Sequence, residues 1–395
     1  SCVLVVRVIG EIGSTFQIEK IVALLEKIYR TYVRWKDVFC TISVFDAYNC
    51  TYNMRVLLVN KYWYIRGGAE RVLLLTKQLL EDAGHEVELF GMHHPKNTFS
   101  NNYFVDYADY SDRSPWAKLR AGMKAMYNRE AKRQFNALVE SFQPDVVHLH
   151  NVYHQLSYSL LDVTQRMNVP TVMTMHDYNM HAPNYRLFHH GHVCDKAKTG
   201  KYYRCLLDNC MENWGESFVA TMAAYVGKRK KYRSRIKAFI APSEYIRQKS
   251  IAYGWDADTV VTIPYPVDAS QFFPTHTTKD GRTVTYLGRL SEEKGLDVFL
   301  NAAKHNSDIP HVIIGDGSLR SKIAHRVREE DIKNVHCVGF QSGDALRQLL
   351  LDTRILVVPS TWYEVSGLTI LEAKLMEIIV IGSNIGAIPE SLPAS

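Results

Sequence analysis

Short apolar runs alternate with amphipathic stretches along most of this chain. The run at 54–60 is almost continuously apolar, which is typical of a strand buried on both faces of a parallel sheet. The stretch at 68–82 repeats its apolar residues with the period of a helix, and Gly84 follows as a stop signal. Further short apolar runs predict strands at 86–90, 146–149, 170–175, 238–240 and 260–263.

A second series of the same kind follows a Pro/Thr/Asp-rich stretch at 265–280. Its predicted strands are 284–287, 311–314, 335–338, 355–358 and 378–381, with helices between them. Regular alternation of strands and helices predicts parallel sheets covered on both faces. A chain of 395 residues is long enough for two such domains, predicted at 54–267 and 268–395.

Two glutamates flank the start of a predicted helix in the second series. Glu364 lies on the loop after the strand 355–358, and Glu372 lies inside the helix that opens at Gly367. The first backbone N–H groups of a helix are unpaired and lie at its positive end, which suits a phosphate. Those predicted here belong to Gly367, Leu368 and Thr369.

The spacing of these residues fits a nucleotide sugar. Five residues of helix separate Gly367 from Glu372, a rise of roughly 7.5 Å, about the distance from a pyrophosphate to its ribose. The diphosphate would then lie on the amides, the ribose near Glu372 and the sugar near Glu364. Two solvated glutamates at an ordinary helix start fit the same spacing, so the spacing alone does not decide.

Arg289 and Lys294 follow the strand 284–287, at the carboxyl end where doubly wound sheets bind ligands. An arginine fork and a lysine point charge would neutralise a diphosphate leaving group. A solvated pair on a loop is the alternative. The combination of this loop with Glu364 and Glu372 about 70 residues later is far more specific than either part.

These motifs resemble those of the family 4 glycosyltransferases, which are retaining enzymes of the GT-B architecture. The resemblance covers about 54–390 and includes GGAER at 67–71, DVVHLHN at 145–151, TMHD at 174–177, APSE at 241–244, IPYPVD at 263–268 and GDG at 315–317. It implies two Rossmann-like, doubly wound domains facing a cleft, with the acceptor on the N-terminal side and the nucleotide sugar on the C-terminal side.

The resemblance also implies the roles of individual residues. Arg289 and Lys294 would stabilise the departing diphosphate, Glu364 would orient the sugar hydroxyls and Glu372 would hold the ribose. His176 would lie near the transferred sugar, although an ordinary loop histidine is the alternative. The other expected donor-binding residues are Gly68, Gly288, Gly315, Gly317, Phe340, Gly367, Leu368 and Thr369. Gly67-Gly68 does not complete a dinucleotide-binding fingerprint, and a tight turn explains Gly67 equally well.

No metal is expected in catalysis. Asp256-Ala-Asp258 matches the Asp-x-Asp of metal-dependent transferases, but it is predicted to be a solvated turn, because it precedes the strand at 260–263 and is remote in sequence from the diphosphate elements. Charged side chains and helix amides are expected to stabilise the leaving group instead. A structural zinc site is a separate possibility in the Cys/His-rich insertion at 181–213. Its ligands would be Cys194, Cys205 and Cys210 with His189, His190 or His192, unless an incomplete set marks a lost site.

Charge and composition limit the classes of partner that the protein is expected to bind. No apolar run approaches 18 residues, so no membrane-spanning helix is predicted, and a net charge of +6 is too small to indicate nucleic acid. The stretch 228–237 holds seven basic residues, and a predicted amphipathic helix carries Trp116, Leu119, Met123 and Met126. Both features would suit contact with anionic lipid headgroups, and both are also explained as ordinary solvated faces. Seven scattered cysteines favour a reducing compartment, so the protein is expected in the cytoplasm, at or near the inner face of the membrane.

Both ends differ from the family pattern. Residues 1–53 are unassigned, and relatives continue beyond the position of Ser395 with a strand and helices, so the C-terminal domain is predicted to be incomplete in this sequence. Relatives also tend to have glycine near Glu377 and proline near Ile379; without the glycine, the turn that ends the helix is less favourable.

The predicted activity is transfer of a sugar from a UDP- or GDP-sugar to a hydroxyl of a carbohydrate or lipid-linked acceptor, in polysaccharide or glycolipid biosynthesis. Two alternatives stay open. One is a noncatalytic nucleotide-sugar-binding protein, and the other is another GT-B enzyme, such as a sugar-nucleotide epimerase.

Overall fold

The computed structural model describes residues 53–107, 115–268, 272 and 281–392, and the side chains of 115–119 are not described. Of the unassigned segment 1–53, only Asn53 lies within the described residues. The described residues form two compact units, one within 53–174 with 229–240 and the other within 175–228 with 241–392. This division differs from the predicted domains, because it places 175–228 and 241–267 with the second series of elements.

The first series of strands forms a six-stranded sheet in the order β2-β1-β3-β4-β7-β8. Strand β1 pairs with β2 and β3, β3 pairs with β4, and β4 pairs with β7, all in parallel, as predicted. The strands are β1 (Arg55–Val59), β2 (Glu86–Phe90), β3 (Val146–Leu149), β4 (Thr171–Thr174), β7 (Ala238–Ala241) and β8 (Val260–Thr262).

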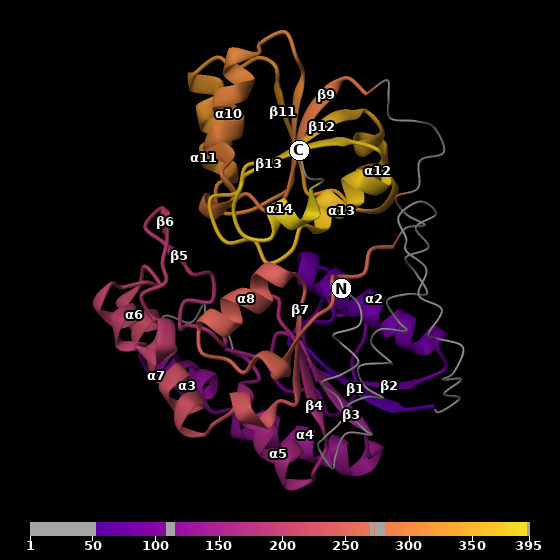
Figure 1. Cartoon of the computed structure of the whole chain (residues 1–395), viewed down its shortest axis with the longest axis vertical. Helices are drawn as coiled ribbons and strands as arrows, with labels where there is room; N and C mark the ends of the chain where they lie inside the picture. Colours follow the sequence, from indigo (N-terminus) through magenta and orange to yellow (C-terminus); the bar gives the residue numbers. More distant parts are fainter. Residues whose placement is uncertain (1–52, 108–114, 269–271, 273–280, 393–395) are drawn as a thin grey trace. The chain divides into compact units, whose positions relative to one another are not determined.

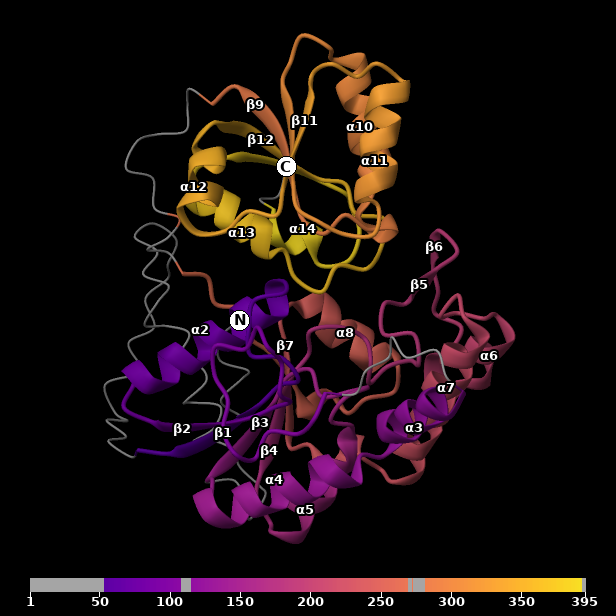
Figure 2. The ribbon, with the colours of Figure 1, turned by 180° about the vertical axis from the view of Figure 1, so that it is seen from behind.

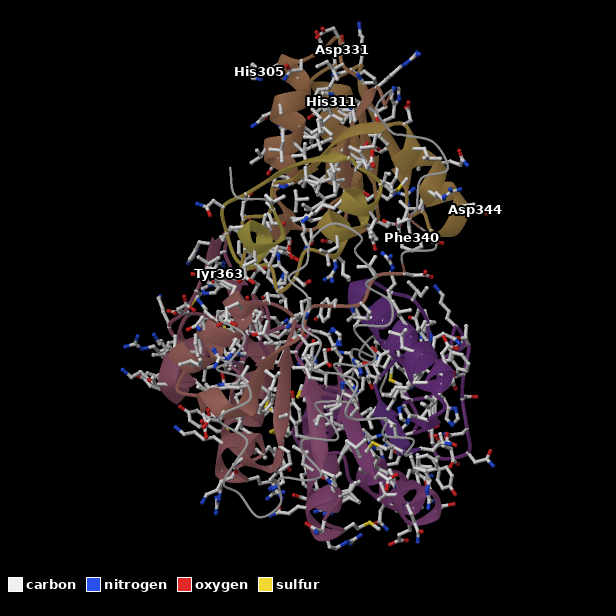
Figure 3. The ribbon with its side chains drawn as sticks, turned by 45° about the vertical axis from the view of Figure 1, so that its right-hand side comes forward. His305, His311, Asp331, Phe340, Asp344 and Tyr363 are labelled. Atoms are coloured by element: carbon white, nitrogen blue, oxygen red, sulfur yellow. A yellow bond between two sulfur atoms is a disulfide. The ribbon has the colours of Figure 1, made fainter. Side chains whose placement is uncertain are left out.

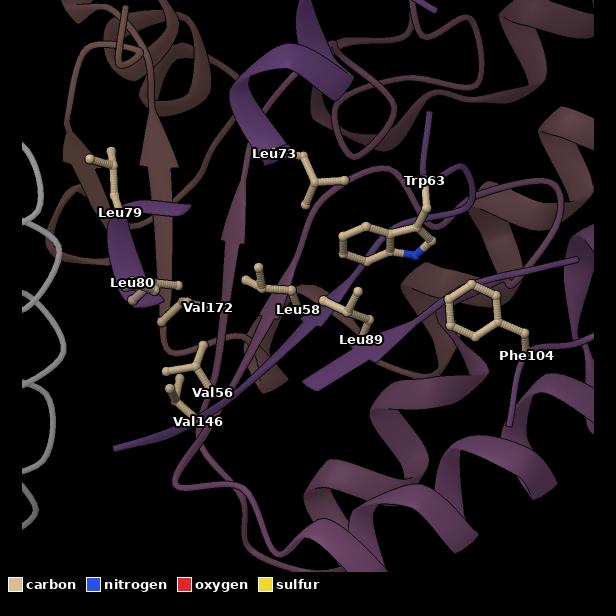
Figure 4. Close-up of a cluster of buried hydrophobic side chains, with 11 residues drawn as sticks. Val56, Leu58, Trp63, Leu73, Leu79, Leu80, Leu89, Phe104, Val146 and Val172 are labelled. Carbon is tan, nitrogen blue, oxygen red and sulfur yellow. The ribbon is translucent and has the colours of Figure 1, made fainter. Parts of the chain in front are cut away.

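The core beside this sheet includes Trp63, a fully buried side chain from the segment that joins β1 to helix α2 (Gly68–Asp82) (Figure 4). Leu58 of β1 and Leu73 of α2 belong to the same buried cluster. The indole N–H donates to the Phe90 carbonyl at 3.2 Å, which satisfies its one polar atom. A Cβ at Gly91 would lie 2.5 Å from the indole nitrogen, so glycine is needed there to admit the ring.

The second series forms a five-stranded parallel sheet in the order β11-β10-β9-β12-β13. The strands are β9 (Thr283–Leu287), β10 (His311–Ile314), β11 (Val335–Gly339), β12 (Thr353–Val358) and β13 (Ile379–Gly382). Strand β9 is central: the chain adds β10 and β11 on one side of it, and then β12 and β13 on the other. This reversal is the topological switch point of a doubly wound sheet, where such folds bind ligands.

Helices cover both faces of the second sheet. Helices α10 (Leu296–His305) and α11 (Arg320–Glu329) lie on one face, and α12 (Gly343–Leu351) and α13 (Leu368–Leu375) lie on the other (Figures 1 and 2). Apolar residues from the strands and helices fill the space between the layers, in one cluster around Phe299 and another around Leu356. The prediction of a doubly wound α/β fold is confirmed.

The remaining elements are short or lie in the connections. They are α3 (Pro115–Met126), α4 (Arg129–Phe142), α5 (Leu161–Arg166), β5 (Phe188–His189), β6 (His192–Val193), α6 (Tyr203–Leu207), α7 (Trp214–Arg229), α8 (Glu244–Ala252) and α14 (Ile388–Ser391). Within the described part of the chain, no helix has the length and apolarity needed to cross a bilayer.

Candidate active site

The strand ends at the switch point approach one another too closely for side chains. The Gly288 N–H donates to the Ile314 carbonyl at 3.0 Å, and the Gly315 N–H donates to the Gly339 carbonyl at 2.8 Å. Gly315 has a φ of +148°, and a Cβ there would lie 1.9 Å from the Gly288 carbonyl oxygen. A Cβ at Gly317 would lie 2.4 Å from the Leu290 carbonyl oxygen. Backbone packing therefore explains Gly315 and Gly317.

The turn after β9 lies directly against the loop after β12. A short 3₁₀ turn, Glu292–Lys294, ends at Gly295, whose φ is +69° and whose absent Cβ would be 1.9 Å from the Pro359 carbonyl oxygen. The Thr361 N–H donates to the Glu293 carbonyl at 2.9 Å and holds the two loops together. Only glycine allows this approach, and the approach brings Lys294 to Glu364.

Lys294 and Glu364 form a partly buried ion pair. The Lys294 Nζ lies 2.6 Å from Glu364 Oε1, and the Ser360 hydroxyl donates to the same oxygen at 2.5 Å. Glu364 is 8% exposed. Burial raises the pKa of its carboxyl, but the Lys294 charge and the hydrogen bonds from Lys294 and Ser360 outweigh that effect and lower the pKa below its ordinary value. Glu364 is therefore an ionised hydrogen-bond acceptor at neutral pH.

The backbone of Glu364 is fixed as firmly as its side chain. Gly386 has a φ of +62°, and a Cβ there would lie 2.4 Å from the Glu364 nitrogen. The Ala387 N–H donates to the Glu364 carbonyl at 2.9 Å. The loop predicted to carry the sugar-binding carboxylate is thus held by the chain that follows β13.

Helix α13 begins at Leu368 with Gly367 as its N-cap, as predicted, and no side chain caps its first amides. Glu372 lies inside this helix and is 1% exposed, so contact with a ribose requires its carboxylate to move. Arg289 is exposed, and its carbonyl accepts a hydrogen bond from the Tyr286 hydroxyl at 2.8 Å. Phe340 follows β11 and is 56% exposed, where an aromatic ring can stack on a base (Figure 3).

His176 lies just after β4 and is half-buried. Its Nδ1 lies 2.8 Å from the Tyr265 hydroxyl, and that hydroxyl donates to the Met175 carbonyl at 2.8 Å. Since a hydroxyl has one hydrogen, the Tyr265 hydroxyl accepts a hydrogen bond from the Nδ1–H of His176. Two residues later, the Tyr178 hydroxyl donates to the Tyr363 carbonyl at 2.9 Å, which ties this loop to the residue before Glu364.

Tyr363 and Asp195 help to hold the loops of this site together, and the sequence patterns did not identify either residue. The Asp195 carboxylate accepts hydrogen bonds from Lys249 at 2.8 Å, Tyr253 at 2.6 Å and Tyr363 at 3.1 Å. Burial raises the pKa of Asp195, but Lys249 and Tyr253 outweigh it and lower that pKa below its ordinary value. The partners of Asp195 are separated from it by 54 to 168 residues, so no local motif indicates them.

Gly68 belongs to the other compact unit, where it is exposed at the start of α2. The preceding Gly67 has an extended φ of −175°, and no atom lies within 4 Å of the position of its missing Cβ. The local turn therefore does not require glycine at position 67. In the same unit, His148 bonds Thr174 at 2.7 Å and its ring lies 4.4 Å from that of His150, as expected for packing at a sheet end.

The structure corrects the predicted zinc ligands. Cys205 and Cys210 form a disulfide, so neither offers a thiolate to a metal. The ligand atoms that lie together among the described residues belong to His189, Cys194 and Asp208. Asp256 caps a short exposed 3₁₀ turn, as predicted for a solvated Asp-x-Asp.

The basic stretch 228–237 is partly used within the fold. Lys230 and Arg235 both bond the Asp162 carboxylate, at 3.2 and 2.5 Å, and Lys132 joins them at 3.3 Å. These cations stabilise their own unit, so the stretch offers less free charge to a lipid surface than its composition suggests. Met123 of α3 is 52% exposed. Membrane contact stays a prediction.

Comparison with known families agrees with this arrangement. A family model described as Glycosyltransferase Family 4 matches residues 66–271, and one described as Glycosyl transferases group 1 matches residues 268–393. An uncharacterized 42.6 kDa protein in the cps region of Klebsiella pneumoniae is 23% identical over 351 residues, covering 85% of this chain and 87% of that protein. The O-antigen chain mannosyltransferase C of Escherichia coli is 22% identical over 343 residues, covering 84% and 80%.

Solved structures are similar over most of the chain. Anabaena Alr3699/HepE in complex with UDP-glucose has a TM-score of 0.55 at 16% identity, covering 87% of this chain and 84% of that one. Sucrose-phosphate synthase from Thermosynechococcus elongatus has a TM-score of 0.57 at 18% identity, covering 85% and 82%. Similarity at this level of identity concerns the fold alone, and it confirms the predicted GT-B class with Rossmann-like parallel sheets.

Proposed function

This chain belongs to Glycosyltransferase Family 4, and on that basis we propose that it transfers a glycosyl unit from a nucleotide diphosphate sugar to an acceptor hydroxyl with retention. The observation that carries this proposal is the Lys294–Glu364 pair at the switch point of the second sheet, with a separation of 2.6 Å. It sets a cation and an ionised carboxylate side by side. The open amides at the start of α13 follow a few residues later.

The proposed roles follow from charge and position. Arg289 and Lys294 stabilise the negative charge that develops on the departing diphosphate, together with the first amides of α13. Glu364 accepts hydrogen bonds from hydroxyls of the transferred sugar through Oε2, because Oε1 is the oxygen that Lys294 and Ser360 bond. His176 forms a hydrogen bond with one further hydroxyl of the transferred sugar. A leaving-group oxygen takes the acceptor's proton on the same face, so no protein nucleophile is assigned.

A UDP- or GDP-sugar is the proposed donor. Alr3699/HepE was solved with UDP-glucose, which supports a uridine donor for a protein of this fold. Relatives in a cps region and in O-antigen chain synthesis support a polysaccharide or lipid-linked acceptor. Catalysis is proposed to need no divalent cation, because side chains and helix amides supply the positive charge.

A donor screen followed by product analysis tests the proposal. Each nucleotide sugar is first added in a thermal-shift assay, since a ligand that binds the folded state raises its stability by mass action. The donor that gives the largest shift is then incubated with oligosaccharide acceptors, with and without added Mg²⁺, and the anomer of the product is read by NMR. An inverted anomer would refute retention, and strict dependence on Mg²⁺ would refute a metal-free mechanism.

The same assay separates the alternatives. A noncatalytic binding protein would shift in melting temperature with a donor, but would neither hydrolyse nor transfer it. An epimerase that leaves the diphosphate linkage intact would change the sugar of the donor and release no nucleoside diphosphate. Release of nucleoside diphosphate that depends on acceptor is the result expected here.

A further inference from the structure

His189 is buried with no hydrogen bond to either ring nitrogen. It lies in the β5–β6 hairpin, is 2% exposed, and neither Nδ1 nor Nε2 has a partner among the described residues. Burying polar atoms in this way costs stability unless something binds them. A neutral imidazole has one ring nitrogen with a lone pair that can bind a metal.

A thiol and a carboxylate lie beside that ring. The ligand atoms of His189, Cys194 and Asp208 are all within 4.8 Å of one another. Cys194 is a free thiol, and Asp208 is held by Lys196 at 2.9 Å. One imidazole nitrogen, one sulfur and one carboxylate oxygen form a set that Zn²⁺ accepts in tetrahedral sites.

We propose that His189, Cys194 and Asp208 bind one Zn²⁺ ion, with water in the fourth position. Lys196 orients Asp208 from outside the coordination sphere, as the outer partners of metal ligands do. This set differs from the three cysteines that the sequence predicted, because Cys205 and Cys210 are bonded to each other.

The ion joins parts of the insertion that have little apolar core. Strands β5 and β6 are two residues each, and α6 has five. The Asn184 amide bridges the Phe188 and Cys210 carbonyls at 2.9 and 2.5 Å. Zinc adds a link from the hairpin to Asp208, the residue after α6. Because binding free energy at a structural site is also folding free energy, the ion stabilises the insertion.

The link extends towards the proposed active site. Asp195 directly follows the ligand Cys194 and accepts a hydrogen bond from Tyr363, which precedes Glu364. A metal at Cys194 thus fixes the loop that holds Tyr363. The zinc proposal itself rests on His189, Cys194 and Asp208 and does not depend on the proposed transferase activity.

Metal binding is measured on the full chain without a polyhistidine tag. The protein is dialysed against Zn²⁺, and bound metal is counted by atomic emission. Cobalt replacement then reports the ligands, since a cobalt–thiolate bond gives a charge-transfer band. The expected result is one equivalent of metal and a band with the intensity of one thiolate. Wild-type protein without bound metal, or a band of two or more thiolates, would overturn the proposal.

Variants assign the ligands. His189→Ala and Cys194→Ala should each lose the bound metal, while His190→Ala, the adjacent histidine outside the set, should keep it. Lys196→Met should weaken zinc binding about tenfold, as loss of an outer partner does. The Cys205→Ser/Cys210→Ser double variant should retain the metal, and its loss there would favour the three-cysteine site instead. Circular dichroism confirms that each variant is folded, and retention of metal by folded Cys194→Ala would refute the assignment.

Discussion

Lys294 has both a structural and a proposed catalytic role, and the structure allows the two to be separated. Replacing it by methionine keeps most of the side-chain volume and leaves Glu364 as a buried carboxylate without its cation. Removing one partner of a buried ion pair costs about 3–5 kcal/mol, and we expect the lower end because 20% of the Lys294 side chain is exposed. The pKa of Glu364 should rise in this variant, since the charge and the hydrogen bond of Lys294 that lower it are lost while the burial that raises it remains.

A second variant restores the charge balance without restoring the cation. In Lys294→Met/Glu364→Gln the buried group is a neutral amide that can still bond Ser360, so about 2 kcal/mol of the loss should return as coupling between the two sites. Stability is measured by urea unfolding, and the dependence of the unfolding free energy on urea concentration is compared among the variants, because a change in it would mean that the unfolded or native state has changed. A double variant as unstable as Lys294→Met would refute the charge-balance explanation.

Measurements of kcat test the proposed catalytic role of Lys294. If Lys294 stabilises the leaving group, kcat should fall by about 10²–10³ in Lys294→Met, as when one donor to a developing anion is lost. The donor Kd should change much less. Recovery of kcat in the double variant would refute a catalytic role for Lys294 and leave it only the task of keeping Glu364 ionised.

Three further predictions concern the fold around the site. Glu377 follows α13 with a φ of +57°, a conformation that glycine adopts without strain, so Glu377→Gly should stabilise the protein by about 1 kcal/mol in urea unfolding. Glu377→Ala should give no such gain. Equal gains from both variants would show that removing the charge of Glu377 is the cause. The pKa of buried His148 is lowered from 6.5 to about 4, so the unfolded chain binds more protons between these values and stability falls as the pH drops from 6.5 to 4. His148→Gln should reduce this slope by about 1.4 kcal/mol per pH unit, and an unchanged slope would refute the assignment to His148. Gly315→Ala should cost more than about 2 kcal/mol through steric overlap with the Gly288 carbonyl, and should abolish donor shifts in the thermal assay. Gly67→Ala is its control, because no atom lies near that position, and equal damage from both changes would contradict the packing argument.

Donor binding tests Glu372 separately. Glu372→Gln keeps the shape of the buried side chain but removes its charge. If Glu372 holds the ribose, the Kd of the nucleoside diphosphate should rise about tenfold, as expected for loss of a charged hydrogen bond, with little change in the melting temperature of the protein alone. An unchanged Kd in isothermal titration calorimetry would remove Glu372 from the donor site.

The order of strands and helices was determined by the sequence alone. Apolar runs of strand length and amphipathic stretches are local patterns, and each is read within a window of a few residues. The same is true of the turn after α13, where Glu377 occupies a left-handed position that favours glycine. The positions of Glu364 on a loop and of Glu372 inside α13 were likewise predicted correctly, and the predicted start of the helix at Gly367 is one residue from its observed start at Leu368.

Only the tertiary structure decided which of these residues meet. Lys294 reaches Glu364 across 70 positions because Gly295 lets one loop lie on the Pro359 carbonyl of another. The bond between Cys205 and Cys210, and the grouping of His189 with Cys194 and Asp208, depend on how the insertion folds back on itself. Asp195 reaches Tyr363 across 168 positions. Such contacts are set by the packing of whole loops and layers, which leaves no short-range periodicity in the chain.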